Sequence, residues 1–95
     1  MTKARNAAQS QTMYLLMAEY GATTLIPLED FAFKVLGLSV NSAKSKAKSN
    51  ELPFAVTRMY NSQKAPWVVH MQDLAAYIED RCSAARIEWG KAQSF

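Results

Sequence analysis

Apolar residues recur at helical spacing in four stretches of the chain. The first three stretches are residues 13–20, 28–36 and 40–49, and each places its apolar side chains on one face of a helix. The fourth begins at residue 72 and is long enough for a helix of about 20 residues, or roughly 30 Å. We therefore predict four amphipathic helices.

Glycine and proline mark where these helices begin and end. Gly21 follows the first stretch and is a natural residue to end a helix. Pro27 precedes the second and suits a helix start, while Gly37 breaks it, so we predict a tight turn at residues 37–39. Asp73 falls in the first turn of the last helix, where a carboxylate favours the positive end of the helix dipole.

Three segments are expected to be extended. Leu25-Ile26 predicts a short strand. Residues 54–60 alternate, with Phe54, Val56, Arg58 and Tyr60 on one face, and residues 67–70 form another apolar run. The polar segment 61–66 lies between these two runs, which together predict a β-hairpin.

The order of helix, tight turn, helix and hairpin is typical of a winged helix-turn-helix. We predict an α+β fold that is mostly α, an excisionase/MerR-like winged helix-turn-helix with an added N-terminal helix and a long C-terminal helix. Residues 12–92 should form a single DNA-binding domain, after a flexible N-terminus (residues 1–11) and before a short tail (residues 93–95).

The positive charge of the chain is concentrated in its middle third. The net charge is +3, yet residues 34–64 contain six basic side chains against Glu51, a net +5, and the segments on either side carry −1 each. Basic clusters attract phosphate and release counterions from DNA, so the charge favours a double-stranded DNA partner. A merely solvated lysine face is the alternative.

The predicted DNA-binding residues lie on the third helix and on the hairpin. Val40, Ala43 and Ala47 share the packed side of the helix, and Lys44 lies at its boundary. The opposite side carries short polar groups edged by lysines, namely Asn41, Ser42, Ser45, Lys46, Lys48 and Ser49. Such a face suits the major groove, with serine and asparagine at base edges and lysine on phosphates. The hairpin adds Arg58, Asn61, Ser62, Gln63 and Lys64 near the backbone or the minor groove. A weak Ser/Lys helix that contacts nothing is the alternative, because serine is a poor helix former.

The C-terminal helix has an apolar stripe longer than one core requires. Its later residues, Ile78, Cys82, Ala85 and Trp89, either project and pair with another subunit or fold back on the N-terminal helix. A homodimer, or a cooperative array on DNA, therefore stays open.

No pattern indicates an enzyme, a cofactor or a metal site. His70 is the only histidine and Cys82 the only cysteine, which leaves no ligand spacing for zinc. We expect His70 to be structural and Cys82 to be a buried, inert thiol. No apolar run is long enough for a membrane span, and the polar N-terminus lacks a signal-peptide core, so we expect a cytoplasmic protein.

Several short motifs resemble the pyocin activator protein family (PrtN type). They are Leu15-Leu16-Met17 with Tyr20, Ile26-Pro27-Leu28-Glu29, Leu52-Pro53 with Arg58, Ser62-Gln63-Lys64-Ala65, and Val69-His70-Met71-Gln72-Asp73-Leu74-Ala75 with Tyr77-Ile78. The resemblance implies a small bacterial or prophage protein that binds upstream DNA and activates transcription of bacteriocin or phage-tail genes, with RNA polymerase as a candidate partner. Residues 40–49 match no family pattern, so a target sequence does not carry over.

Two other functions fit the same sequence. The short winged core with a basic wing is also similar to phage excisionases, which bend DNA and direct recombination. A protein-interaction adaptor that uses the C-terminal helix is a third reading, and it predicts no salt-dependent affinity for DNA.

Overall fold

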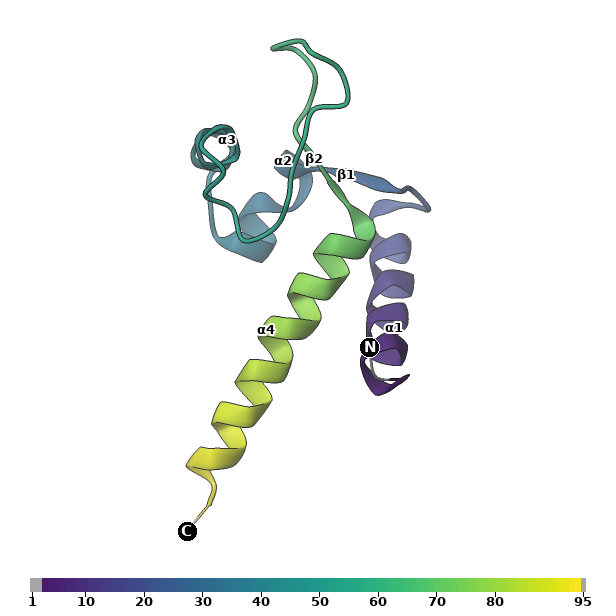
Figure 1. Cartoon of the computed structure of the whole chain (residues 1–95), viewed down its shortest axis with the longest axis vertical. Helices are drawn as coiled ribbons and strands as arrows, with labels where there is room; N and C mark the ends of the chain where they lie inside the picture. The colour runs from purple at the N-terminus through teal and green to yellow at the C-terminus, as the bar shows by residue number, and fades with distance from the viewer. Residues whose placement is uncertain (1–2, 95) are drawn as a thin grey trace.

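The structure is a computed structural model that describes the backbone of residues 3–94 and the side chains of residues 11–94. It is mostly helical with one small antiparallel sheet, so the α+β class is confirmed (Figure 1). The elements in chain order are α1 (Lys3–Tyr20), β1 (Leu25–Pro27), α2 (Leu28–Phe31), the π-helical turn η1 (Ala32–Leu36), α3 (Val40–Lys48), β2 (Val68–His70) and α4 (Met71–Ala92).

The sheet joins two segments that lie far apart in the sequence. β1 pairs with β2, with Ile26 opposite Val69, and both of these side chains are buried. The strand predicted at Leu25-Ile26 is therefore confirmed. Its pairing with residues 68–70 was not predicted, because nothing in a local pattern identifies the partner of so short a strand.

The predicted β-hairpin is wrong in its extent. Residues 54–60 form no strand, and the two arms meet in a single bridge, in which the amides of Thr57 and Val68 donate to each other's carbonyls at 3.0 and 2.9 Å. Pro66 has no amide N–H, so the pairing cannot extend on that side as a regular ladder. The alternation survives in part: Phe54, Val56 and Arg58 are half-buried, but Tyr60 is 76% exposed.

The second predicted helix is present but is not uniform. Four residues of α2 lead into η1, and the change occurs at Phe31, whose backbone has φ −127° and ψ −5°. Gly37 then adopts a left-handed conformation (φ 69°), which favours glycine and ends the helix as predicted. The Leu38 amide donates to the Ala32 carbonyl at 3.2 Å and closes the turn.

The core lies where the sheet meets α2, α3 and the start of α4. Its largest fully buried side chains are Phe31, Ile26, Leu28, Leu74 and Val69. Ala43 and Ala47 are also buried, so α3 lies close to its neighbours, as the small residues predict. Val40 is 39% exposed, which contradicts its predicted place on the packed face, since it is the first residue of α3 and lies at the end of that helix.

The two long helices, α1 and α4, pack against each other near the core. α1 begins at Lys3, earlier than the apolar spacing indicates, and residues 1–2 lie outside the described residues. Leu16 of α1 is buried, and the Thr12 hydroxyl donates to the Glu79 carboxylate of α4. No helix within residues 3–94 has the length and apolar character that crossing a membrane requires.

The C-terminal half of α4 projects from the domain (Figure 1). Residues 80–94 are exposed throughout, so this half does not fold back on α1 within the chain. Cys82 is exposed, and the prediction of a buried thiol is wrong. The apolar stripe of α4 was identified correctly, but helical spacing does not show where the neighbouring elements end. The proposed division into a flexible N-terminus, one domain and a tail stays a prediction.

Candidate nucleic-acid interface

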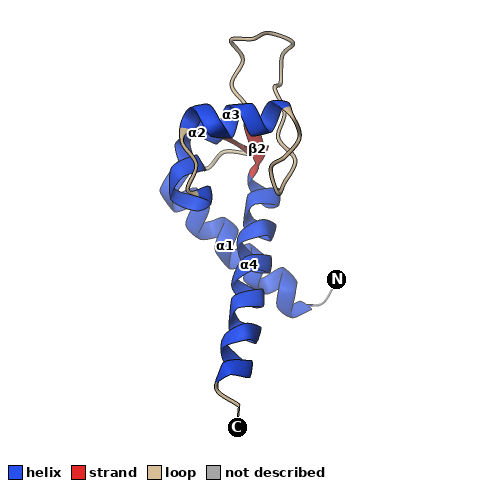
Figure 2. Cartoon of the chain, turned by 90° about the vertical axis from the view of Figure 1, so that its left-hand side faces the viewer, coloured by secondary structure: helices blue, strands red, loops and turns tan. Residues whose placement is uncertain are grey.

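α3 presents a polar, lysine-edged face, as its sequence predicts. Ala43 and Ala47 are buried on one side of the helix, while Asn41, Ser45 and Lys48 are exposed. The predicted face also includes Ser42 and Ser49, which are exposed, and Lys46, which is half-buried. Figure 2 shows α3 crossing the end of the molecule that is opposite to the C-terminus of α4.

Two serines of this face, Ser42 and Ser49, form hydrogen bonds at the two ends of α3. Ser39 is the N-cap: its Oγ accepts from the Ser42 amide at 3.2 Å and its hydroxyl donates to Ser42 Oγ at 3.0 Å. At the other end, the Ser49 hydroxyl donates to the Ser45 carbonyl at 3.2 Å. These contacts leave Asn41 and Ser45 as the short polar side chains best placed to contact a ligand. A serine directly before a helix is a recognisable cap signal, so Ser39 could have been found from the sequence.

The C-terminal end of α3 is closed by a left-handed asparagine. Asn50 has φ 58°, its amide donates to the Ala47 carbonyl at 3.3 Å, and the Glu51 amide donates to the Lys46 carbonyl at 2.9 Å. This pattern is a Schellman motif, in which asparagine tolerates a backbone that most L residues avoid. Lys46 and Lys48 lie in the last turn, where a cation stabilises the negative end of the helix dipole.

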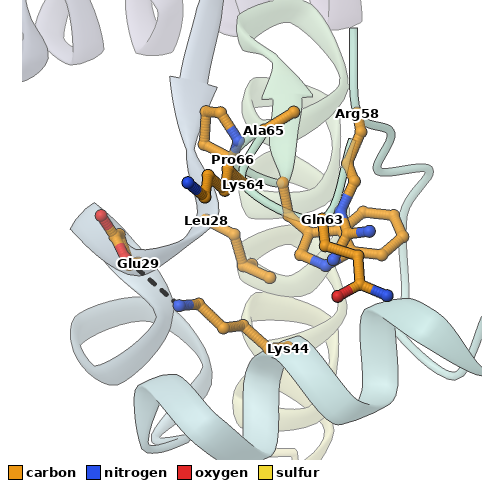
Figure 3. A pocket seen from close by; sticks show the side chains of 9 residues that line it. Leu28, Glu29, Lys44, Arg58, Gln63, Lys64, Ala65 and Pro66 are labelled. Atoms are coloured by element: carbon orange, nitrogen blue, oxygen red, sulfur yellow. Dashed lines mark ion pairs between the residues drawn. The ribbon is translucent and has the colours of Figure 1, made fainter. Parts of the chain in front are cut away.

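A pocket of about 160 Å³ lies between α2, α3 and the 58–67 segment (Figure 3). Four predicted DNA-binding residues line it, namely Lys44, Arg58, Gln63 and Lys64, together with Leu28, Glu29, Ala65, Pro66 and Trp67. Lys44 Nζ lies 3.8 Å from a carboxylate oxygen of Glu29. Three cations against one carboxylate leave the pocket with a net positive charge, which suits a phosphate.

Arg58 is held in place by an aromatic ring. Its guanidinium carbon lies 4.5 Å from the centre of the Trp67 ring, and Arg58 Nε is buried with no acceptor among the described side chains and backbone. Sequence reasoning missed Trp67 and Glu29 as parts of this site. The Trp67 contact follows from register, because a bridge between Thr57 and Val68 places residues 58 and 67 opposite each other.

The other two predicted DNA-binding residues of the hairpin, Asn61 and Ser62, lie on the same loop as Gln63 and Lys64. Asn61 is exposed, while Ser62 is half-buried and its Oγ accepts from the Lys64 amide at 3.2 Å. The predicted subunit-contact residues are remote from this loop. Ile78 is half-buried near the core, and Cys82, Ala85 and Trp89 are exposed on the far half of α4.

His70 has a structural role at the start of α4, as predicted. Its Nδ1 accepts from the Gln72 amide at 3.0 Å, so the imidazole is the N-cap of the helix, while Asp73 lies in the first turn. Within the described residues, no group of three or more His, Cys, Asp and Glu side chains is arranged to hold a metal ion.

Comparison with known proteins adds a family to this geometry. The family model described as pyocin activator protein PrtN matches residues 12–85. The chain belongs to the pyocin activator protein family. Neither the curated proteins nor the solved structures give a significant match.

The pyocin activator match includes the whole candidate interface. It extends from α1 through α3, the 58–67 segment and the first half of α4, and it ends before Trp89. The resemblance drawn from the sequence motifs is therefore confirmed at the level of the family.

Proposed function

We propose that this chain is a sequence-specific double-stranded DNA-binding protein that activates transcription of bacteriocin or prophage genes. In this proposal α2 with η1, the turn at Gly37 and α3 form a helix-turn-helix. The sheet of β1 and β2 with the 58–67 segment forms a short wing.

One observation carries the proposal: the exposed polar face of α3 lies at the same end of the molecule as the cationic pocket. Lys44 belongs to α3 and lines this pocket with Arg58 and Lys64, so the helix and the wing contribute to one surface. Membership of the pyocin activator family supports the role in transcription activation.

The docking follows from the chemistry of the side chains. α3 enters the major groove with Asn41 and Ser45 at base edges, since both are exposed and the helix caps do not depend on their side chains. Lys46 and Lys48 contact phosphates along the edges of the groove. Arg58 and Lys64 contact the adjacent backbone from the wing.

Lys34 does not belong to this surface, although it adds to the charge of the middle third. Its ammonium forms an ion pair with the Glu19 carboxylate of α1. This pair ties η1 to α1 and lowers the pKa of Glu19, chiefly through the hydrogen bond from Lys34.

The test is a titration of the purified chain against labelled random-sequence duplex at two salt concentrations. We expect the parent chain to bind DNA with an affinity that falls steeply as salt rises. The double variant Lys46→Ala, Lys48→Ala should show a flatter salt dependence. Lys91→Ala, which removes a lysine at the far end of α4, is the matched control and should bind as the parent does. No binding at low salt would overturn the proposal, and so would a loss of affinity in the Lys91→Ala control as large as that in the variant lacking Lys46 and Lys48.

The activator role has a separate test. Sequences selected by the bound protein are placed upstream of a reporter gene, and transcription is measured with the parent chain and with the double lysine variant. Transcription should rise only with the parent. Binding without a rise in transcription, combined with strong DNA bending, would instead favour the excisionase-like function.

A further inference from the structure

The projecting half of α4 continues the stripe that forms the core. Met71, Leu74 and Ala75 are at most 2% exposed and lie on the face of α4 that the domain covers. The same face continues as the seam, defined as Ile78, Cys82, Ala85 and Trp89, whose spacings of four, three and four residues are those of a coiled coil. Within the described part of the chain nothing covers the far end of this seam, where Trp89 is 68% exposed.

We propose that the seam packs against the same seam of a second copy of this chain, with the two α4 helices antiparallel. A two-fold axis between positions 82 and 85 places Cys82 of one copy opposite Ala85 of the other. The same axis places Ile78 opposite Trp89 of the second copy. The two small residues at the centre let the helices approach closely, and the larger pair closes each end. Ile87 lies on the opposite side of α4 and takes no part.

The charges beside the seam identify the second copy and its direction. At about 100° per residue, Arg81 and Glu88 lie along one flank of the seam, and Glu79 and Arg86 lie along the other. In an antiparallel pair, each flank faces the same flank of the partner helix. Arg81 then meets Glu88 of the second copy, and Glu79 meets Arg86 of the second copy. Glu79 is half-buried and its carboxylate already accepts a hydrogen bond from the Thr12 hydroxyl of α1. The self-complementarity of the helix therefore rests on Arg81 and Glu88 of the second copy, a pair that the two-fold axis forms twice.

A parallel pair has the opposite electrostatics. Residues five apart on opposite flanks face each other in that arrangement, which brings Arg81 against Arg86 of the second copy on both sides of the dimer. Like charges at such positions are destabilising. The flanking charges therefore favour the antiparallel pair and disfavour the parallel one.

The contact fits the length of helix that is exposed. From Ile78 to Trp89 the seam extends about 18 Å along the helix axis at 1.5 Å per residue. Its N-terminal end is set by the domain, because Leu74 and Ala75 are already fully buried. The side chains of Arg81, Arg86 and Glu88 are exposed and form no ion pair within residues 11–94, so they are available to a partner.

A charge reversal at Arg81 tests both the dimer and its direction. We expect sedimentation equilibrium to show a dimer for the parent. Arg81→Glu should weaken association about tenfold, because the two-fold axis places the new carboxylate beside Glu88 of the second copy at two places in each dimer. Arg81→Glu with Glu88→Arg should restore the parent value. Both positions are exposed, so the fold should survive, and an unchanged circular dichroism spectrum checks this.

Lys91→Glu is the matched control, because it reverses a charge of the same helix outside the seam. It should leave association unchanged. A parent that is monomeric at all concentrations would overturn the proposal. So would stronger association of Arg81→Glu, since in a parallel pair the new carboxylate would face Arg86.

Cross-linking gives a second, independent readout. The parent chain is mixed with a size-tagged Cys82→Ala, Ala85→Cys variant and oxidised. An antiparallel seam predicts disulfides between the two different chains, through positions 82 and 85. Disulfides joining identical chains would indicate a parallel seam and overturn the proposal. Neither experiment contains DNA, so its outcome is separate from that of the proposed function.

Discussion

The guanidinium of Arg58 lies over the ring of Trp67, with its central carbon 4.5 Å from the ring centre. The two residues belong to opposite arms of the 54–70 segment, which are joined by backbone hydrogen bonds only at Thr57 and Val68. The stacking therefore extends the contact between the arms where the ladder stops. It also directs a planar cation toward the pocket shared with α3 (Figure 3).

Arg58→Lys should weaken DNA binding although the charge is kept. Lysine has a flexible ammonium in place of a planar group that stacks on the ring, so the cation is no longer held at the pocket. A stacked cation contributes about 0.5–1 kcal/mol at a partly exposed site, which corresponds to a loss of affinity of roughly two- to fivefold.

The measurement for Arg58 is a duplex titration at fixed salt. Lys64→Arg is the control, since it exchanges the same two residue types at an exposed position of the same pocket and should bind at least as well as the parent. Equal affinities for the parent and Arg58→Lys would show that the stacking does not position the cation for DNA.

Asn50→Ala should destabilise the domain. The backbone at this position has φ 58°, and the left-handed conformation costs an ordinary L residue about 1–2 kcal/mol. Asn50→Gly should keep or raise stability, because glycine adopts this conformation freely. Urea unfolding of the three proteins measures the difference. An alanine variant as stable as the parent would mean that the Schellman motif does not fix the end of α3.

Much of the fold could be predicted from periodicity. The stripe of Leu28, Phe31 and Ala32 was identified from spacing and is buried, and Gly37 ends the helix where a left-handed residue is needed. Spacing reports which side of an element faces the core. It does not report how far the neighbour extends, which is why Cys82 lies on the correct face but is exposed.

The parts that could not be predicted depend on contacts between distant residues. The partner of β1, the ion pair between Glu29 and Lys44, and the pair between Glu19 and Lys34 all join separate elements. No local pattern contains these pairings, so the pocket could not be assembled from the sequence. The cations of the site were predicted as residue types, but the surface they share follows only from the fold.

The stability of the chain should fall as the pH rises from about 10 to about 12, because of Tyr20. Burial, followed by the adjacent Glu19 carboxylate, raises the pKa of Tyr20 from 10.0 to about 12. The unfolded chain then loses this proton at lower pH than the folded chain does. The contribution of Tyr20 to the free energy of unfolding is fully present below pH about 10. It is lost as the pH rises through the pKa of Tyr20 in the folded chain.

Tyr20→Phe should remove this component of the pH dependence. Urea unfolding at a series of alkaline pH values measures it, with Tyr60→Phe as the control at a tyrosine that is 76% exposed. Absorbance at alkaline pH should also show one phenol ionising late in the parent and absent from Tyr20→Phe. A late phenol that persists in that variant would contradict the assignment to Tyr20.

Substitutions on the two parts of the α3 face should affect DNA binding in different ways. Lys46→Ala or Lys48→Ala removes a phosphate contact, so affinity should fall similarly for all duplexes and the salt slope should fall by about one ion each. Asn41→Ala or Ser45→Ala removes a base contact, which should cost about 1–3 kcal/mol on the selected site and little on random duplex.

Ser42→Ala is the matched control, because the Ser42 hydroxyl oxygen accepts a hydrogen bond from the hydroxyl of Ser39, the N-cap of α3. Titrations of selected and random duplex at several salt concentrations separate the two classes, since only the base contacts change the ratio of the two affinities. If all four alanine variants change that ratio equally, α3 does not lie in the groove with this face.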